Sequence, residues 1–279
     1  MDIIVCIKAV PSSTEVRINP ETNTLMRDQM ELIINPFDLY AIEEALRLQE
    51  AHGGTVTVLT MGPPKAEEQL REALGMGCDA AVLLSAREFA GADTWATAYT
   101  LAQGIHKLGR YDLVLCGRQA TDGDTGQVGP GIAQQLGVPQ LTYVCKVREI
   151  APAAASEQGA DRCSPTGGHV IVERLLEEGR EVVETRLPAL LTVVKDINIP
   201  RSPTPRALRR ASRAEIAVWG PDDLPGVEMA ALGLDGSPTR VIRMATPEAR
   251  AGAVRIVAGE SVEAQAAALA ELLLAEGVV

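Results

Sequence analysis

The sequence predicts an α/β fold in which a doubly wound, mostly parallel sheet is covered by helices on both faces. Short apolar runs alternate with amphipathic segments of helical period over the first half of the chain. The connections are short and rich in glycine and proline, which suits right-handed crossovers between parallel strands. Hydrophobic residues make up 46% of the chain but aromatic residues only 3%, so alanine, valine, leucine and isoleucine must build the core.

Each predicted strand of the parallel sheet is a compact apolar run. Such continuous runs are typical of strands that are buried on both faces. The four runs are Asp2–Lys8, Thr55–Thr60, Ala80–Ser85 and Leu113–Cys116. Ala9–Ser13 is expected to be a loop, and a short hairpin is predicted where Val16–Ile18 and Thr24–Met26 flank a turn.

The predicted helices have an apolar face and recognisable ends. Pro36 suits the first turn of a helix that begins at Asn35–Asp38, and Gly53–Gly54 ends it. Further helices are expected over Lys65–Met76, over Thr94–Leu108 after a cap near Asp93, and over Gly126–Leu136. Thr125 is the predicted cap of the last of these helices, and Gly137 closes it.

The pattern changes after Gln140, where the sequence predicts an antiparallel extension of the sheet. Its strands are expected at Leu141–Glu149, His169–Leu175 and Glu181–Arg186, with a turn at Glu177–Gly179. Ala151–Gly168 is rich in alanine, proline, glycine and serine and is expected to be a loose surface loop. Leu187–Val194 is predicted to be one more buried strand.

From Asp196 onward the chain is expected to leave the compact domain. Prolines alternate with arginines between Pro200 and Arg213, and such a tail cannot bury much of its own surface. The arginines are expected to form a solvated face or to pair with an acidic partner. Val262–Leu274 is predicted to be an amphipathic helix, which needs another surface to pack on. The sequence thus predicts an α/β domain at 1–195 and an arm at 196–279 that wraps a partner subunit.

Composition argues against several classes of function. The net charge of −11 disfavours nucleic-acid binding, and no apolar run is long enough for a transmembrane segment. No signal peptide is expected at the N-terminus. Five scattered cysteines suit a reducing cytoplasm and predict neither a disulfide framework nor a metal site.

The best candidate site is Cys116–Pro130, which follows a predicted strand and leads into a predicted helix. In open α/β sheets such loops hold ligands, and the free N–H groups of a helix start favour an anion such as a phosphate. The strand-end segments Cys6–Ala9, Asn35–Asp38 and Thr60–Gly62 can converge on the same edge to make a nucleotide-sized cleft. The Asp122–Asp124 turn can bind hydroxyl groups, or it can be an acidic turn that caps the helix.

Several common catalytic and phosphate-binding signatures are absent from the sequence. There is no G-x-G-x-x-G after the first strand, no P-loop, no G-x-S-x-G elbow and no Cys/His pair for covalent catalysis. The residues alone therefore predict a nucleotide-binding α/β domain with an interaction arm. They do not extend as far as redox chemistry.

Four segments resemble the β subunit of electron-transfer flavoproteins, and the resemblance covers essentially the whole chain. They are VCIKAVP (5–11), INPFDLYAIEEALRL (34–48), CGRQATDGDTGQVGP (116–130), and VIVERLLEEGREVVETRLPALLTV followed by NIPR (170–201). The resemblance implies a Rossmann-like fold and a homologous, FAD-carrying α subunit that the arm embraces. Family members hold either AMP or a second FAD in the β subunit, and the Asp-Gly-Asp-Thr and Gln-Val-Gly-Pro of this loop resemble the electron-bifurcating branch.

Carried onto this chain, the resemblance implies a bound FAD that accepts a hydride from NADH. The implied partners are the α subunit, a flavin-dependent dehydrogenase or quinone oxidoreductase, and a low-potential acceptor such as ferredoxin or flavodoxin. Gly123 lets a larger cofactor approach the backbone, whereas Gly126 stands where relatives more often have alanine. No side chain is expected to act as an acid or base, and Arg118 is the nearest basic candidate to favour a reduced, anionic flavin. The implied cofactor-binding residues are Cys6, Ala9, Asn35, Pro36, Phe37, Asp38, Met61, Gly117, Arg118, Gln119, Ala120, Thr121, Asp122, Gly123, Asp124, Thr125, Gly126, Gln127 and Val128.

Two alternatives stay open at this point. The first is a housekeeping electron-transfer flavoprotein β subunit that holds AMP and has no NADH chemistry. The second is a stand-alone ATP-binding domain, which would need a glycine-rich phosphate loop that the sequence lacks and a self-contained C-terminus.

Overall fold

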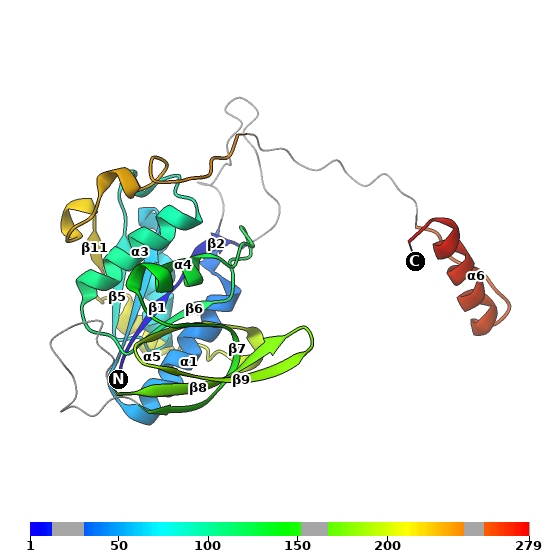
Figure 1. The fold of residues 1–279 in the computed structure, drawn as a ribbon, viewed down its shortest axis with the longest axis horizontal. Coiled ribbons are helices and arrows are strands. Elements are labelled where there is room, and N and C mark those ends of the chain that lie inside the picture. The colour runs from blue at the N-terminus through cyan, green and yellow to red at the C-terminus, as the bar shows by residue number, and fades with distance from the viewer. Residues whose placement is uncertain (13–30, 152–166, 243–253, 279) are drawn as a thin grey trace. The chain divides into compact units, whose positions relative to one another are not determined.

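The computed structural model describes residues 1–12, 31–151, 167–242 and 254–278 (Figure 1). The chain divides into a large unit, Met1–Val241, and a small unit, Ile242–Val279. The large unit contains a nine-stranded sheet, and the small unit contains a helix.

The sheet has the strand order β11-β5-β4-β1-β6-β10-β7-β8-β9. Its strands are β1 (Asp2–Cys6), β4 (Thr55–Met61), β5 (Ala80–Leu84), β6 (Leu113–Gly117), β7 (Gln140–Ala151), β8 (His169–Leu176), β9 (Gly179–Arg186), β10 (Ala189–Val193) and β11 (Ala217–Trp219). Neighbours from β11 to β7 in this order are parallel, whereas β7, β8 and β9 are antiparallel. The predicted parallel sheet and its antiparallel extension are both confirmed.

Helices pack on both faces of the parallel strands, as predicted. One face carries α1 (Pro36–His52), α2 (Glu67–Met76) and α5 (Pro205–Ala211), and the other carries α3 (Thr94–Leu108) and α4 (Val128–Leu136). Asp93 caps α3, since its carboxylate accepts the N–H groups of Trp95 and Ala96.

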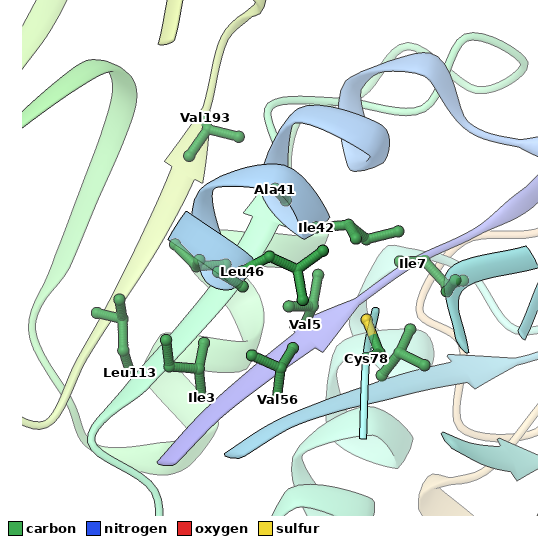
Figure 2. Close-up of a cluster of buried hydrophobic side chains, with 14 of the residues drawn as sticks. Ile3, Val5, Ile7, Ala41, Ile42, Leu46, Val56, Cys78, Leu113 and Val193 are labelled. Atoms are coloured by element: carbon green, nitrogen blue, oxygen red, sulfur yellow. The ribbon is translucent and has the colours of Figure 1, made fainter. Parts of the chain in front are cut away.

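The core between α1 and the sheet is aliphatic, as the composition predicts. Figure 2 shows Ile42 and Leu46 of α1 pointing onto Ile3 and Val5 of β1, with Leu113 of β6 beside them. All five side chains are almost fully buried. Burial of one such side chain stabilises the fold by about 1.5–3 kcal/mol, so this layer fixes α1 on the strands next to the site.

The segment after β1 differs from the prediction. The expected loop at Ala9–Ser13 contains β2 (Ala9–Pro11), which pairs antiparallel with β3 (Leu32–Ile34). This pairing buries Val10 completely and satisfies backbone groups that an irregular loop would leave to water. The hairpin predicted at 16–26 and most of the loop predicted at 151–168 lie outside the described residues.

The compact unit extends beyond the boundary expected after residue 195. The α5 helix packs on α2, and the guanidinium of Arg71 donates to the carbonyl groups of Ala211 and Ala214 at 2.9 and 3.2 Å. β11 then joins the sheet beside β5. The prolines of this stretch do not prevent burial, because Ala211 and Leu224 still reach the core.

The small unit contains α6 (Val262–Ala275), which confirms the helix predicted at 262–274. Ser261 caps it by accepting the N–H of Ala264. No residue of α6 is buried within the part of the chain that the structure describes. Over the same described residues, no helix is both long and apolar enough to cross a membrane.

Candidate functional site

The strand order reverses at β1. The strands β4 and β5 lie on one side of β1, whereas β6 lies on the other. After β1 the chain leads to α1 on one face, and after β6 it leads to α4 on the opposite face. In an open α/β sheet the ligand crevice lies at the carboxyl ends of strands that diverge in this way. The loops after Cys6 and Gly117 therefore frame the candidate site.

Asp38, in the first turn of α1, joins the two diverging chain segments. Its Oδ2 accepts the N–H of Lys8 at 2.7 Å, and its Oδ1 accepts the N–H of Gly117 at 3.0 Å. Burial raises the pKa of this carboxyl group to about 7, although the hydrogen bonds from Asn35, Lys8 and Gly117 act in the opposite direction. The Asp38 side chain, predicted to contact a cofactor, thus binds the protein's own backbone.

Asn35 holds the other end of the same loop. Its side-chain Nδ2 donates to the carbonyl of Gln119 at 2.9 Å, and its Oδ1 accepts the N–H of Thr121 at 3.1 Å. The side chain is only 1% exposed, so both hydrogen bonds are shielded from water. Because a primary amide both donates and accepts, Asn35 satisfies two backbone groups that face it with opposite polarity.

Gly117 lets α1 approach β6 closely. A Cβ at this position would lie 2.3 Å from Oδ1 of Asp38 and 2.7 Å from the carbonyl carbon of Phe37. Both distances are shorter than non-bonded atoms allow, so a larger residue would push α1 and the loop apart. The predicted site residues Phe37, Asp38 and Gly117 are therefore in direct contact.

The two aspartates of the loop also have protein partners. Asp122 pairs with Nζ of Lys8 at 2.6 Å, an exposed ion pair of the kind that contributes about 0–1 kcal/mol. Asp124 accepts from the Gln119 side chain and adopts a left-handed backbone with φ of 52°. The alternative that this turn caps the following helix is wrong, because neither aspartate caps α4.

The α4 helix begins at Val128, two residues after the predicted start. Gly126 has a left-handed backbone with φ of 63°, which cannot continue a right-handed helix, and the N-cap is Gln127 rather than Thr125. Among the described residues, the N–H groups of Val128 and Gly129 have no acceptor. They are free donors at the sheet edge, which is the arrangement that favours an anion.

Arg118 is placed by a residue that sequence reasoning missed. Its guanidinium carbon lies 4.8 Å from the centroid of the Tyr143 ring, and its backbone N–H donates to the carbonyl of Val193 at 2.9 Å. Tyr143 has a left-handed backbone with φ of 59°, and its N–H donates to the hydroxyl of Thr192. No periodic pattern predicts this pairing, because Arg118 follows β6 whereas its partners come from β7 and β10.

The remaining predicted residues lie at the same edge. Ala9 begins β2 and Met61 ends β4, the neighbour of β1. Cys6 is in register with Cys116 on β6, and both thiols are buried. The hydrogen bond with Cys6, together with burial, raises the pKa of Cys116, so this thiol stays neutral. Lys8 lies within the candidate segment Cys6–Ala9 but was not among the implied cofactor-binding residues, although its position at the end of a predicted strand was a usable signal.

A second polar surface lies on α5 and the residues directly after it. Four arginines surround an open hollow of about 480 Å³: Arg206, Arg209, Arg210 and Arg213. Their side chains project from a chain whose net charge is −11. The hollow therefore suits a partner with an acidic surface.

The fold and the geometry of this edge define a Rossmann-like α/β protein. Comparison with known proteins identifies its family. The family model described as "Electron transfer flavoprotein domain" matches residues 22–224.

The matches to similar proteins cover nearly the whole chain. The "Electron transfer flavoprotein subunit beta" of Thermoanaerobacterium thermosaccharolyticum is 50% identical and covers 91% of this chain and 92% of its own. The "Protein FixA" of Azorhizobium caulinodans is 48% identical, and the match covers 90% of this chain and 86% of that protein. The "Caffeyl-CoA reductase-Etf complex subunit CarD" of Acetobacterium woodii is 44% identical and covers 100% of both chains.

The chain belongs to the electron transfer flavoprotein family, as one of its beta subunits. This membership replaces the alternative of a stand-alone ATP-binding domain. It also implies an α-subunit partner.

Proposed function

We propose that this beta subunit binds its own FAD at the edge formed by β1, β6 and α4, with the adenosine diphosphate part at the start of α4. The observation that carries the proposal is the pair of free N–H groups of Val128 and Gly129, directly after the loop that Asn35 and Asp38 hold in place.

The residues present fit a dinucleotide. A Cβ at Gly123 would meet no atom within 4 Å, so the tip of the loop leaves open space next to the backbone. The protein's own hydrogen bonds hold the loop, because Asn35 binds it at Gln119 and Thr121. This preorganisation reduces the entropy that nucleotide binding would otherwise have to overcome.

A flavin bound in this site would accept a hydride from NADH and pass the electrons on. The roles of this chain are to bind and orient the cofactor and to set its electrostatic surroundings. We assign Arg118, the basic side chain of this loop, to stabilise negative charge on the reduced cofactor. The residues proposed to line the site are those at 117–128, with Cys6, Ala9, Pro36, Phe37 and Met61 around them.

The relatives support electron bifurcation as the mode of action. CarD belongs by its name to a caffeyl-CoA reductase–Etf complex, in which a flavoprotein works together with a reductase. We propose that electrons pass from NADH to the α-subunit FAD and a flavin-dependent dehydrogenase or quinone oxidoreductase, and to a low-potential acceptor such as ferredoxin or flavodoxin. The complex would act in the cytoplasm.

The same proposal assigns two contact surfaces. The exposed apolar side chains of α6, including Val262, Leu269 and Leu274, are proposed to pack on the α subunit. The arginines of α5 are proposed to meet an acidic surface of the dehydrogenase.

Counting the flavins of the purified heterodimer tests the proposal. Two FAD per heterodimer, with bleaching of the flavin absorbance by NADH, is the expected result. One FAD together with one AMP, and no bleaching, would contradict it and establish the AMP-holding alternative.

A further inference from the structure

We propose that Asp38 is a proton-linked positioning residue: its ionised carboxylate fixes the two chain segments that frame the nucleotide site, so nucleotide binding releases a proton from it. This inference rests on the proposal that a nucleotide occupies the loop at 117–128. It assigns Asp38 no contact with the nucleotide.

The geometry requires two acceptors at this carboxyl group. The two backbone N–H groups, from Lys8 after β1 and from Gly117 at the end of β6, each point at a different oxygen of Asp38. Lys8 and Gly117 lie on segments that run to opposite faces of the sheet. Within the described residues, Asp38 is thus the side chain that joins both segments to α1.

A protonated Asp38 serves its two donors unequally. The neutral acid keeps one carbonyl oxygen as a good acceptor, whereas its hydroxyl oxygen is a weaker acceptor than a carboxylate oxygen. One of the two hydrogen bonds is therefore weakened on protonation. The loop is then held less tightly either at Lys8 or at Gly117, which is the residue that precedes Arg118.

Few charges act on this carboxyl group. The ammonium of Lys8 favours the ionised form, but its Nζ is already paired with Asp122. Cys116 and Cys6 on the neighbouring strands are buried thiols, and Asn35 is neutral. Burial therefore dominates, and it places the pKa of Asp38 at about 7. Near neutral pH both forms are populated, and a ligand that needs the ordered loop selects the ionised one.

The test is a calorimetric titration of the heterodimer that retains its α-subunit FAD and lacks a nucleotide in this subunit. FAD is titrated at pH 7 in buffers of different ionisation enthalpy, which reports the number of protons exchanged. The wild type should release about half a proton per FAD at pH 7 and almost none at pH 8.5. Its dissociation constant should be about tenfold larger at pH 6 than at pH 8.5.

Two variants separate this role from a merely structural one. Asp38→Asn should show no proton release and a flat pH profile. Glu44→Gln is the matched control, because Glu44 is a second buried carboxyl group on α1 whose pKa burial raises, and it lies away from the loop. Its pH profile should stay like that of the wild type.

The outcomes distinguish this inference from the proposed function. FAD binding without proton release, or with a dissociation constant independent of pH, overturns the role of Asp38 alone. If the site binds AMP and not FAD, the assignment of FAD fails, and the difference in proton release between wild type and Asp38→Asn still tests Asp38. This difference is needed because the phosphate of AMP itself titrates near pH 6. If neither nucleotide binds, both proposals fall. Should Asp38→Asn fail to fold, the pH dependence of the wild type decides.

Discussion

The helices α1 and α6 are similar in sequence character but opposite in surroundings. Both were predicted from an amphipathic pattern, and α1 also from the signals at its two ends. Eight residues of α1 are buried, whereas no residue of α6 is. An amphipathic pattern thus predicts that a helix forms, but not what covers it. Four predictions test whether α1 is stabilised by this chain alone and α6 by a partner.

The largest effect is expected from a core truncation in α1. Leu46→Ala should lower the free energy of unfolding by about 3 kcal/mol, because Leu46 is 2% exposed and its removal leaves a cavity above β1. Leu274→Ala in α6, where the side chain is 66% exposed, should change it by less than about 0.5 kcal/mol. Urea unfolding of the purified chain measures both. Equal losses would show that α6 is packed within this chain.

The second largest difference is expected when an ion pair of each helix is broken. Arg201 binds Glu43 of α1 through two hydrogen bonds at 2.8 and 3.0 Å, and Glu43 is buried. Arg201→Gln should therefore lower the free energy of unfolding by about 2 kcal/mol, since it removes the charged partner of a buried carboxylate and leaves it, among the described residues, only the backbone N–H of residue 201. Arg255→Gln breaks an exposed pair with Glu276 after α6 and should cost about 0–0.5 kcal/mol. Equal losses of stability for Arg201→Gln and Arg255→Gln in urea unfolding would contradict this prediction.

The acidic residues in the first turns should respond to pH in opposite directions. Asp38 of α1 has a raised pKa, so the folded protein keeps this proton up to pH 7 while the unfolded chain loses it near pH 3.8. Stability from this group is therefore greatest at low pH and falls as pH rises to 7. The free energy of unfolding of the wild type should therefore fall, relative to that of Asp38→Asn, by on the order of 2 kcal/mol as the pH rises from 5 to 8.5.

Glu263 of α6 supplies the opposite case. Hydrogen bonds to the backbone at its own position and to Ser261 lower the pKa of Glu263, so its stabilising contribution disappears as pH falls. The stability lost on Glu263→Gln should therefore be greatest at neutral and alkaline pH and should vanish as the pH falls. Unfolding curves at several pH values measure both variants, and a wild-type slope in Asp38→Asn would disprove the assignment.

The smallest effect concerns association. Leu274→Asp should weaken binding to the α subunit about tenfold, because it puts a charge on the exposed apolar side of α6. Glu271→Gln on the same helix is the control and should bind like the wild type. Sedimentation of the mixed subunits measures both. Unchanged binding of Leu274→Asp would remove α6 from the proposed contact.

The sequence predicted the parallel strands and their helices well, because each of these elements carries its own apolar period. It missed β2, β3 and β11, which are three residues long and exist only through partners distant in sequence. The extent of the compact unit was missed for the same reason, since the contact of Arg71 with Ala211 spans 140 residues. The start of α4 was misplaced because Gly126 takes a left-handed conformation that no periodic pattern shows.

The sequence predicted that the strand-end segments meet, but not how their side chains are directed. The segments 35–38 and 117–128 do meet at one sheet edge, as parallel strand ends must. Asn35 and Asp38, however, direct their polar atoms at the backbone rather than outward. The direction of these two side chains depends on which backbone groups lie nearest. The packing of α1 against β6 determines those neighbours, and the sequence pattern does not show it. The Arg118–Tyr143 contact joins two strands in the same way.

The short strand β11 has a consequence for how this protein can be shortened. Its three residues pair with Val82, Leu83 and Leu84 and so cover the outer side of β5. A chain that stops at residue 195 would leave β5 as an open edge, with unpaired N–H and C=O groups next to a strongly apolar strand. Such an edge recruits other chains, so a fragment ending there should aggregate, whereas one ending at 241 should stay dispersed.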